Sequence, residues 1–332
     1  MGKTIVVLCD GTGKEYGPTN TNVVHAYELL RGRSANQLVL YDPGIGTFAP
    51  PWLERHVGDW LGEKLSKAFG YGLRENLTDT YSFLMEHYED GDELFLLGFS
   101  RGAFTVRCLA GLLMQCGLLW PHQDTLVPYA VRHYFEMWAD DSEREQRQKV
   151  VDDFKATFTR PCVPKVVAVW DTVAAYGLFG GARFPNATLH HEIQFGFQAL
   201  ALDEFRIKFR PSLWEPAAAK QTIEQVWFAG AHSDVGGGYA ERGLSDIALA
   251  WLLDKAEAQG LRLVDGWRKG LAHNPEQDLH DETAKLCWRL LNRLDGIFGG
   301  SPERDVPGNA EHHPSVDERQ RLRPDYRPGK QA

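Results

Sequence analysis

The chain has 332 residues, 43% of them hydrophobic, and a formal net charge of −9 at pH 7. This length and apolar content are those of a soluble globular protein with a sizeable core, built as one large domain or two small ones. The acidic balance argues against nucleic acid as a partner, because nucleic-acid-binding proteins normally carry a basic excess on at least one face.

The cysteines form neither a disulfide framework nor a CxxC metal site, because their number is odd and they are widely spaced. They are Cys9, Cys108, Cys116, Cys162 and Cys287. Most lie in apolar runs, so we expect reduced, buried thiols. The chain as a whole is expected to need no cofactor. The N-terminal apolar stretch is too short for a signal peptide, and the longest uncharged run is too short to cross a bilayer. The chain is therefore expected to be cytoplasmic as synthesised, with any export independent of a signal peptide.

The first elements alternate between strand and helix. Residues 4–9, TIVVLC, are β-branched and apolar and end at Asp10, which predicts a buried parallel strand followed by a sharp loop. A helix is expected from about Thr21, a suitable N-cap, to Gly32, and a second strand at 37–41. This order favours an α/β fold of the α/β-hydrolase type, with a mostly parallel central sheet flanked by helices.

Residues 48–69 break the pattern. They contain two prolines and two tryptophans among alternating charges, without a clean period. Two interpretations stay open: a helical, lid-like insertion, or a surface loop packed by its own aromatic residues. A long helix at about 72–88 follows, with apolar residues at helical spacing.

The stretch LFLLGFSRGAFTVRCLAGL at 94–112 carries the most specific local signal. Apolar residues lead to Gly98, Ser100 stands between Gly98 and Gly102, and a helical pattern follows. A serine on such a turn is strained and exposed, and the backbone N–H of Arg101 faces the same space. This is the GxSxG pattern of a nucleophile elbow. The alternative is an ordinary strand-to-helix turn, but the flanking elements favour the elbow.

An aspartate follows the next predicted strand. Residues 120–163 are expected to be mostly helical, with a charge run that marks a solvated helix face. The strand KVVAVW at 165–170 then leads to Asp171. Ligands of open α/β sheets lie outside the carboxyl ends of the strands, which favours a catalytic acid. A turn-former or a helix cap is the open alternative.

A long connection at 174–222 separates this strand from the next. Its Asp203, Glu204 and Arg206 fit either a buried ion network or charges on a helix face. Because the connection joins two candidate catalytic loops, we expect it to form walls of an acyl-binding pocket.

A histidine follows the strand predicted at 223–229. His232 lies in the stretch GAHSDVGGGY, whose glycines allow close approach of the backbone. The order Ser100, Asp171, His232 is that of an α/β-hydrolase triad, with each residue on a loop at the same sheet edge. Asp234 is the rival acid, although its closeness in sequence to His232 suits it better to ordering the glycine loop.

The rest of the chain is expected to complete one domain and to add a tail. A helix with a serine cap is predicted at 245–259. Residues 301–332 are interpreted as a polar C-terminal tail to a single catalytic domain of residues 1–300. His312 and His313 are rivals for the base, but they follow no apparent strand.

The three polar residues predict a serine hydrolase that forms an acyl-enzyme. His232 would take the proton of Ser100 during attack on an ester carbonyl, and Asp171 would hold the imidazole in the right tautomer.

The oxyanion of that reaction needs hydrogen-bond donors. We expect one from the backbone N–H of Arg101 and a second from the loop after the first strand, at Gly11 or Thr12. Asp10 would shape this loop, because its carboxylate would repel an oxyanion if it pointed into the hole.

Two alternatives from other classes stay open. One is a non-catalytic binding protein on a hydrolase fold. The other is a metal-dependent hydrolase, separable by its sensitivity to chelators. Its ligands would be Asp10, Asp171, His232 and Asp234.

Seven blocks of sequence carry a family resemblance. They are CDGT at 9–12, YDPGIGT at 41–47, GFSRGAFTVRCLAGL at 98–112, VWDTVAAYG at 169–177, LDEFRIKFRPSLW at 202–214, AHSDVGGGY at 231–239 and HPSVDER at 313–319. Together they resemble the DUF2235 family, which contains the catalytic domain of type VI secretion phospholipase effectors of the Tle1 class. The resemblance implies an α/β-hydrolase fold and a serine esterase or lipase acting on phospholipids. It also implies a lipid or small ester substrate, peripheral membrane contact, and a secretion-system or immunity protein as partner.

Overall fold

The computed structural model describes residues 2–11, 16–30, 36–44, 61–137, 143–173, 188–284, 292 and 303–330, except for the side chains of residues 61–71 and of Lys208. The strands of the main sheet are β1 Thr4–Cys9, β2 Gln37–Asp42, β3 Glu93–Phe99, β6 Pro164–Trp170, β7 Phe195–Ala201, β8 Thr222–Phe228 and β9 Glu311–His312. The α-helices are α1 Asn22–Leu30, α2 Leu61–His87, α3 Arg101–Cys116, α4 Val127–Glu136, α5 Arg144–Phe158, α6 His232–Gly236, α7 Ser245–Ala258 and α9 Pro314–Leu322. Smaller elements are the strands β4 Leu118–Leu119 and β5 Thr159–Arg160 and the 3-10 turns η1 Asp124–Leu126, η2 Ile207–Phe209, η3 Trp267–Gly270 and η4 Glu282–Ala284.

The central sheet of the described residues has the strand order β2-β1-β3-β6-β7-β8-β9, and each of its neighbouring pairs is parallel. The chain leaves β1 for β2 on one side and then continues from β3 on the other side. The strand order therefore reverses between β1 and β3, which is where open α/β sheets form ligand sites at the carboxyl ends of their strands. The prediction of an α/β fold with a mostly parallel sheet is confirmed.

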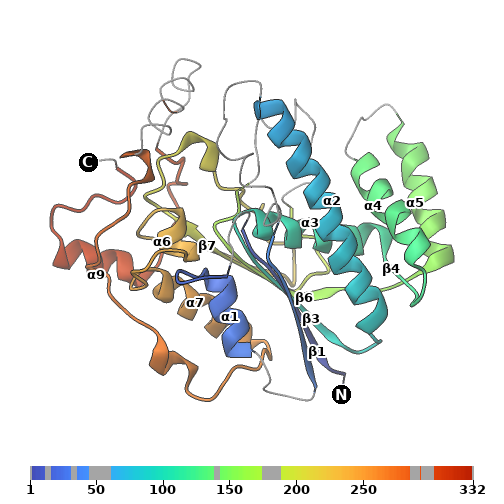
Figure 1. Ribbon diagram of the computed structural model, residues 1–332, viewed down its shortest axis with the longest axis horizontal. Helices are drawn as coiled ribbons and strands as arrows, with labels where there is room; N and C mark the ends of the chain where they lie inside the picture. The colour runs from blue at the N-terminus through green and yellow to red at the C-terminus, as the bar shows by residue number, and fades with distance from the viewer. Residues whose placement is uncertain are drawn as a thin grey trace.

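Side chains of the central strands alternate between two apolar layers, as the period of a strand requires. In β1, Ile5 and Val7 belong to one core cluster with α2, α3, α4 and α5. Val6 and Leu8 belong to the other cluster, with α1 and α7. Figure 1 shows α1 and α7 to the left of the sheet and α2, α4 and α5 to its right. The central strands β1, β3 and β6 are thus buried on both faces, which explains why they read as continuous apolar runs.

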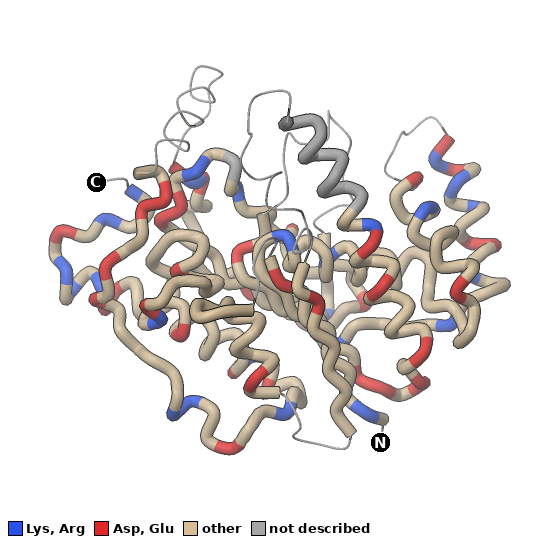
Figure 2. Tube along the Cα trace, viewed as in Figure 1, with Lys and Arg blue, Asp and Glu red and all other residues tan. Residues whose placement is uncertain are grey.

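The insertion at 120–163 contains α4 and α5, as expected, and the ribbon of β4 and β5 closes it. Only Val151 and Phe154 of α5 are buried, and Figure 2 shows charges of both signs along this helix, whereas β1 is uncharged. The charge run therefore marks a solvated face, as expected.

The central strand β7 was not predicted. The expected connection at 174–222 contains β7, which lies between β6 and β8 in the middle of the sheet. Its sequence FGFQALA has no β-branched residue and includes a glycine and a glutamine. Burial on both faces, rather than intrinsic propensity, accounts for its strand structure.

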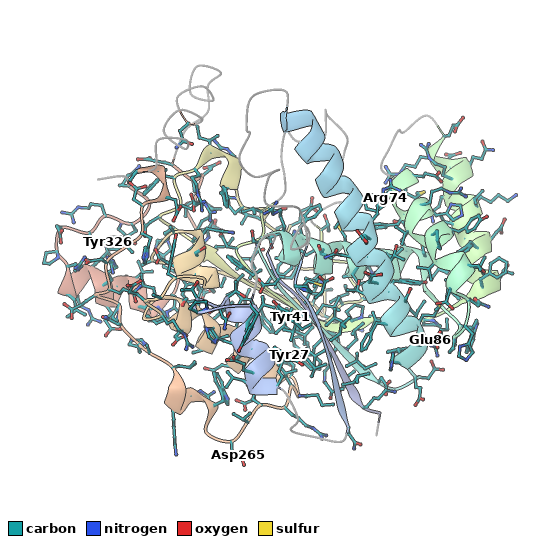
Figure 3. All side chains as sticks on the ribbon, in the orientation of Figure 1. Tyr27, Tyr41, Arg74, Glu86, Asp265 and Tyr326 are labelled. Atoms are coloured by element: carbon teal, nitrogen blue, oxygen red, sulfur yellow. The ribbon has the colours of Figure 1, made fainter. Side chains whose placement is uncertain are left out.

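The expectation of a polar tail is corrected for the described part of 301–332. β9 extends the sheet beside β8, and Val316 and Tyr326 join a buried cluster with Trp227. Figure 3 labels Tyr326 at this side of the molecule. The charged composition of this segment gives no sign that it packs against the sheet. Arg319 is nevertheless only 2% exposed, and its burial is tolerated because its guanidinium donates to backbone carbonyl groups. This segment therefore belongs to the same domain as the sheet.

The predicted lid-like stretch at 48–69 is only partly described. Residues 61–69 form the start of α2, which begins eleven residues before the expected position near 72, and residues 45–60 lie outside the described residues. None of the helices that are described combines the length and hydrophobicity needed to cross a membrane. The four described cysteines are buried free thiols, as expected, and Cys287 is outside the described part.

Candidate active site

Ser100 directly follows β3 in a strained conformation, with φ 58° and ψ −120°. The two flanking glycines allow backbone segments to approach each other closely. A Cβ atom at Gly102 would lie 2.1 Å from the carbonyl oxygen of Cys9, and one at Gly98 would lie 2.7 Å from that of Gly102. The sharp turn thus needs both glycines. Ser100 is only 7% exposed, because the loop after β1 and the ring of His232 pack beside it. The expectation of an exposed serine is therefore corrected.

His232 opens the short helix α6 beyond β8, and its ring faces Ser100. The distance from Nε2 to Ser100 Oγ is 2.8 Å. Phe99 lies 4.6 Å from the imidazole and Phe209 lies 5.0 Å from it, measured between ring centroids. The backbone N–H of His232 donates to Glu204 Oε2 at 3.2 Å. The two aromatic contacts therefore position the imidazole ring, and the hydrogen bond to Glu204 fixes the backbone of His232.

Asp171 follows β6 and is fully buried. Its Oδ2 accepts a hydrogen bond from His232 Nδ1 at 2.6 Å, and its Oδ1 accepts one from the backbone N–H of Ala201 at 3.0 Å. Its φ is 37°, so both Asp171 and Ser100 are among the few described non-glycine residues with positive φ. Strain of this kind persists where the surrounding structure imposes it, and it clusters at functional sites.

Arg304 was not predicted, and it makes the largest set of contacts with Asp171. Its Nη1 donates to Asp171 Oδ1 at 2.6 Å, and its Nη2 donates to Oδ2 at 2.8 Å. The same two nitrogens donate to the carbonyl oxygens of Ala201 at 2.8 Å and Phe209 at 2.6 Å. In the sequence this arginine is one of many charges in a polar stretch, so no motif distinguishes it.

These contacts set the charge states of the pair. Burial by itself would raise the pKa of Asp171, but the charge and hydrogen bonds of Arg304, with a contribution from His232, bring it well below its ordinary value. Burial lowers the pKa of His232, and the hydrogen bond and charge of Asp171 offset only part of this effect. The arrangement therefore favours a carboxylate at 171 and a neutral imidazole at 232, with Nδ1 protonated and Nε2 as the acceptor.

The loop after β1 reaches the same place. A Cβ atom on Gly11 would lie 3.4 Å from the Cβ of Ser100. However, the backbone N–H of Gly11 donates to Asp10 Oδ1 at 2.6 Å. Asp10 Oδ2 accepts from the hydroxyl groups of Thr21 and Tyr41, at 2.6 and 3.1 Å, and Figure 3 shows Tyr41 beside its packing partner Tyr27. Asp10 thus shapes the loop and occupies the Gly11 donor.

Thr12 is outside the described residues, whereas Arg101 is the first residue of α3. The first N–H groups of a helix have no acceptor within the helix, and they point along its axis. The backbone of Arg101 thus begins a helix immediately after Ser100.

Asp234 does not contact the imidazole of His232. Its Oδ2 accepts from the backbone N–H groups of Ala231 and His280, at 3.0 and 3.1 Å, and its Oδ1 lies 2.7 Å from His280 Nδ1. Tyr239 stacks on His280 with ring centroids 3.7 Å apart. Asp234 therefore forms a separate Asp–His pair that orders the glycine loop.

The metal-site alternative needs its four ligands to converge. Asp171 meets His232, while Asp10 and Asp234 have the other partners described above. Among the described residues, no group of three or more histidines, cysteines and carboxylates is arranged to hold a metal ion. The proposed ligand set is thus divided among three places. His313, a rival for the base, stacks on Phe228 instead, with centroids 4.6 Å apart.

The charged residues expected in the connection at 174–222 form a buried network that contacts His232 through Glu204. Glu204 and Arg206 form a buried ion pair with a 2.6 Å contact, and the Arg206 guanidinium lies 3.6 Å above the ring of Phe209. Asp203 accepts hydrogen bonds from Tyr326 and from the backbone of Gly230 and Gly329. Of the two interpretations, the buried network is confirmed.

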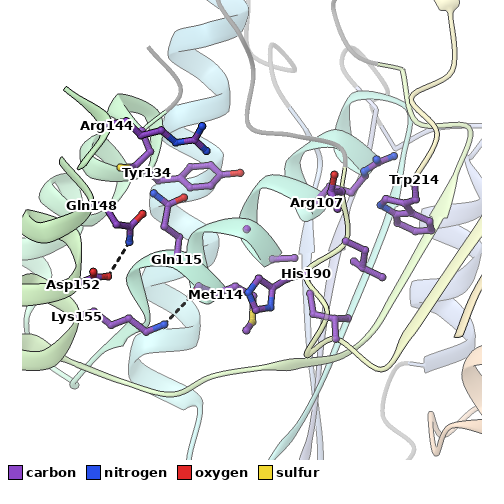
Figure 4. A pocket seen from close by; sticks show the side chains of 16 residues that line it. Arg107, Met114, Gln115, Tyr134, Arg144, Gln148, Asp152, Lys155, His190 and Trp214 are labelled. Carbon is purple, nitrogen blue, oxygen red and sulfur yellow. Dashed lines mark hydrogen bonds between the residues drawn. The ribbon is translucent and has the colours of Figure 1, made fainter. Parts of the chain in front are cut away.

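A cavity of about 530 Å³ lies between α3, α4 and α5 (Figure 4). Arg107 and Gln115 of α3 line it together with Tyr134, Lys155 and Trp214, and the Arg107 guanidinium lies 4.8 Å from the ring centroid of Trp214. Its described lining residues include none of the hydrogen-bonded row formed by Ser100, His232 and Asp171. An acyl pocket walled by the connection therefore stays a prediction.

Three known proteins are similar to this chain. The uncharacterized protein YEL023C of Saccharomyces cerevisiae is 32% identical over 226 residues, which are 65% of this chain and 33% of that protein. The crystal structure of an uncharacterized protein from Pseudomonas aeruginosa is 18% identical with a TM-score of 0.45, and the similarity covers 89% of this chain and 51% of that one. The structure of the Tle1 effector bound to the VgrG spike from the Type 6 secretion system is 19% identical with a TM-score of 0.36, covering 72% and 51%. The chain thus spans about a third of the yeast relative and about half of each solved chain.

A family match covers most of the chain. Residues 3–255 match the family described as T6SS, Phospholipase effector Tle1-like, catalytic domain. The matched range includes Ser100, Asp171 and His232, and it ends before Arg304. It confirms the resemblance that the sequence blocks carry: this chain belongs to the family of Tle1-like catalytic domains of T6SS phospholipase effectors.

Proposed function

We propose that this protein is a serine hydrolase that cleaves carboxylic ester bonds of phospholipids. The observation that carries the proposal is the continuous hydrogen-bonded row from Ser100 Oγ through His232 to Asp171, with distances of 2.8 and 2.6 Å. Family membership supplies the substrate class, because the family is one of phospholipase catalytic domains. A protein of the type VI secretion system is the partner that the same membership leads us to propose.

In the proposed reaction, Ser100 attacks the ester carbonyl carbon while its proton moves to His232 Nε2. Asp171 accepts a hydrogen bond from the protonated Nδ1 of His232, which keeps Nε2 free to act as the base and stabilises the imidazolium that forms. The imidazolium then protonates the leaving alcohol. Water enters, His232 deprotonates it, and the acyl-enzyme is hydrolysed to a fatty acid.

We assign one oxyanion donor to the backbone N–H of Arg101. It is the first residue of α3, where the helix dipole also favours negative charge. Gly11 is a poorer choice than expected, because its N–H already donates to Asp10. A second donor from Thr12 stays a prediction.

Active-site labelling and lipid hydrolysis test the proposal together. The 332-residue chain should react with a fluorophosphonate, and mass spectrometry should locate the adduct on Ser100. The same preparation should release fatty acid from vesicles of phosphatidylethanolamine, phosphatidylglycerol or phosphatidylcholine, with or without EDTA. Hydrolysis that EDTA abolishes, without labelling of Ser100, would support the metal-dependent alternative instead. A folded protein with neither reaction would favour a binding protein.

The fall of kcat/KM on the acid side of the pH profile, the acid limb, should occur at a low pH. Protonated His232 cannot accept the serine proton, and burial lowers the pKa of this residue. A lowered pKa means that the ring binds its inactivating proton only at lower pH, so kcat/KM should hold its plateau below the ordinary imidazole titration near about 6.5. Rates with a water-soluble ester across the acidic and neutral range measure this limb. An acid limb above that value would contradict the proposed base or its buried environment.

A further inference from the structure

Arg304 binds the candidate acid from outside the matched family domain. Its side chain is 2% exposed, and the match ends at residue 255. The two parallel N–H···O contacts to Asp171 have the fork geometry that makes arginine–carboxylate pairs both strong and directional. One guanidinium therefore holds both carboxylate oxygens of Asp171.

We propose that Arg304 is a positioning residue of this site, which holds the Asp171 carboxylate in the orientation and charge state that align His232. The proposal rests on the proposed hydrolase function. It assigns to the C-terminal segment a part in catalysis that the matched domain does not contain.

The contacts of Arg304 join three loops at the carboxyl edge of the sheet. Besides Asp171 after β6, the guanidinium binds the carbonyl of Ala201 at the end of β7 and that of Phe209 in η2. Phe209 in turn packs edge-on against the ring of His232. One cation thus positions both the acid and an aromatic contact of the base.

The charge of Arg304 also has an electrostatic effect on His232. The charged groups that act on the imidazole are two carboxylates, Asp171 and Glu204, and the guanidinium of Arg206, which pairs with Glu204. Arg304 acts through Asp171, with which its guanidinium pairs. Each guanidinium reduces the attraction that a carboxylate exerts on an imidazolium. Removing the charge of Arg304 should therefore favour protonated His232 and move the acid limb of kcat/KM to higher pH.

The test compares two buried arginines of the same segment. Arg304→Gln should lower kcat/KM by about 100-fold, the order expected for a small misplacement of a catalytic group, and should move the acid limb to higher pH. Arg319→Gln is the matched control: Arg319 is also buried, with 2% of the residue exposed against 8% for Arg304, but it binds the carbonyl groups of Pro275 and Gln277. It should reduce stability without moving the pH profile. Arg304→Lys, which keeps the charge but not the fork, should lose turnover with little change in the acid limb.

Arg304→Gln leaves the buried Asp171 carboxylate unpaired, which is strongly destabilising and can prevent folding. The same substitution in the Asp171→Asn variant keeps the test decisive in that case. In Asp171→Asn there is no carboxylate to leave unpaired. If Arg304 acts through Asp171, adding Arg304→Gln to Asp171→Asn should cause no further loss in the rate of fluorophosphonate labelling.

Two results would overturn the inference: a pH profile and kcat/KM of Arg304→Gln that match those of Arg319→Gln, or losses that multiply in the double variant. A wild-type protein with neither turnover nor labelling would instead refute the proposed function.

Discussion

Ser100→Ala is expected to lower kcat for ester hydrolysis by about a millionfold, because loss of the nucleophile alone removes as much rate as loss of a whole triad. Fluorophosphonate labelling should disappear as well. The side chain loses one hydroxyl and its hydrogen bond to His232, so the melting temperature should stay within about 3 °C of the wild-type value. Ester turnover, labelling and thermal unfolding measure the three effects on one preparation.

Ser233→Ala is the matched control for this change. Ser233 is 8% exposed, close to the 7% of Ser100, and it is the residue next to His232. This variant should be labelled and should hydrolyse esters near the wild-type rate. Undiminished turnover in Ser100→Ala would move the nucleophile elsewhere, and loss of folding would mean that the serine is structural.

Asp171→Asn is expected to lower kcat by about 10⁴-fold, as the loss of a triad carboxylate does where the imidazole is left in the wrong tautomer. It also leaves the buried guanidinium of Arg304 without its anion, so the free energy of unfolding should fall by about 3–5 kcal/mol. Activity must therefore be normalised to the folded fraction, which circular dichroism or a thermal melt provides.

Asp234→Asn separates the two candidate acids. Asp234 is buried like Asp171 and also pairs with a histidine, but that histidine is His280. Its replacement should loosen the glycine loop and lower stability, while most of the turnover remains. If only Asp234→Asn abolished hydrolysis, the assignment of Asp171 as the acid would be wrong.

Local patterns were sufficient to locate the elements that carry the candidate site. The apolar runs of β1, β3 and β6 were recognised because strands buried on both faces are hydrophobic throughout. The glycines around Ser100 were recognised because a sharp turn requires them. In contrast, β7 was missed, since its strand structure depends on the neighbours that bury it.

Contacts across long separations explain the other misses. Arg304 and Asp171 are 133 residues apart, and nothing local to either predicts their pairing. The packing of β9 beside β8 and the pairing of Asp234 with His280 are of the same kind. The position of the loop after β1 at the carboxyl edge of the sheet predicts an oxyanion donor at Gly11 or Thr12, but only the structure reveals that the N–H of Gly11 donates to Asp10.

The sequence by itself determined the alternation of strands and helices, the strained turn at Ser100, and the chain order of serine, aspartate and histidine. These follow from residue types and spacings within one element, which a single stretch of chain contains. The tertiary structure alone decided which aspartate meets His232, which arginine holds that aspartate, and that residues 303–330 complete the domain. Such choices depend on distances between segments that only the packed sheet brings together, and on the need to pair each buried charge.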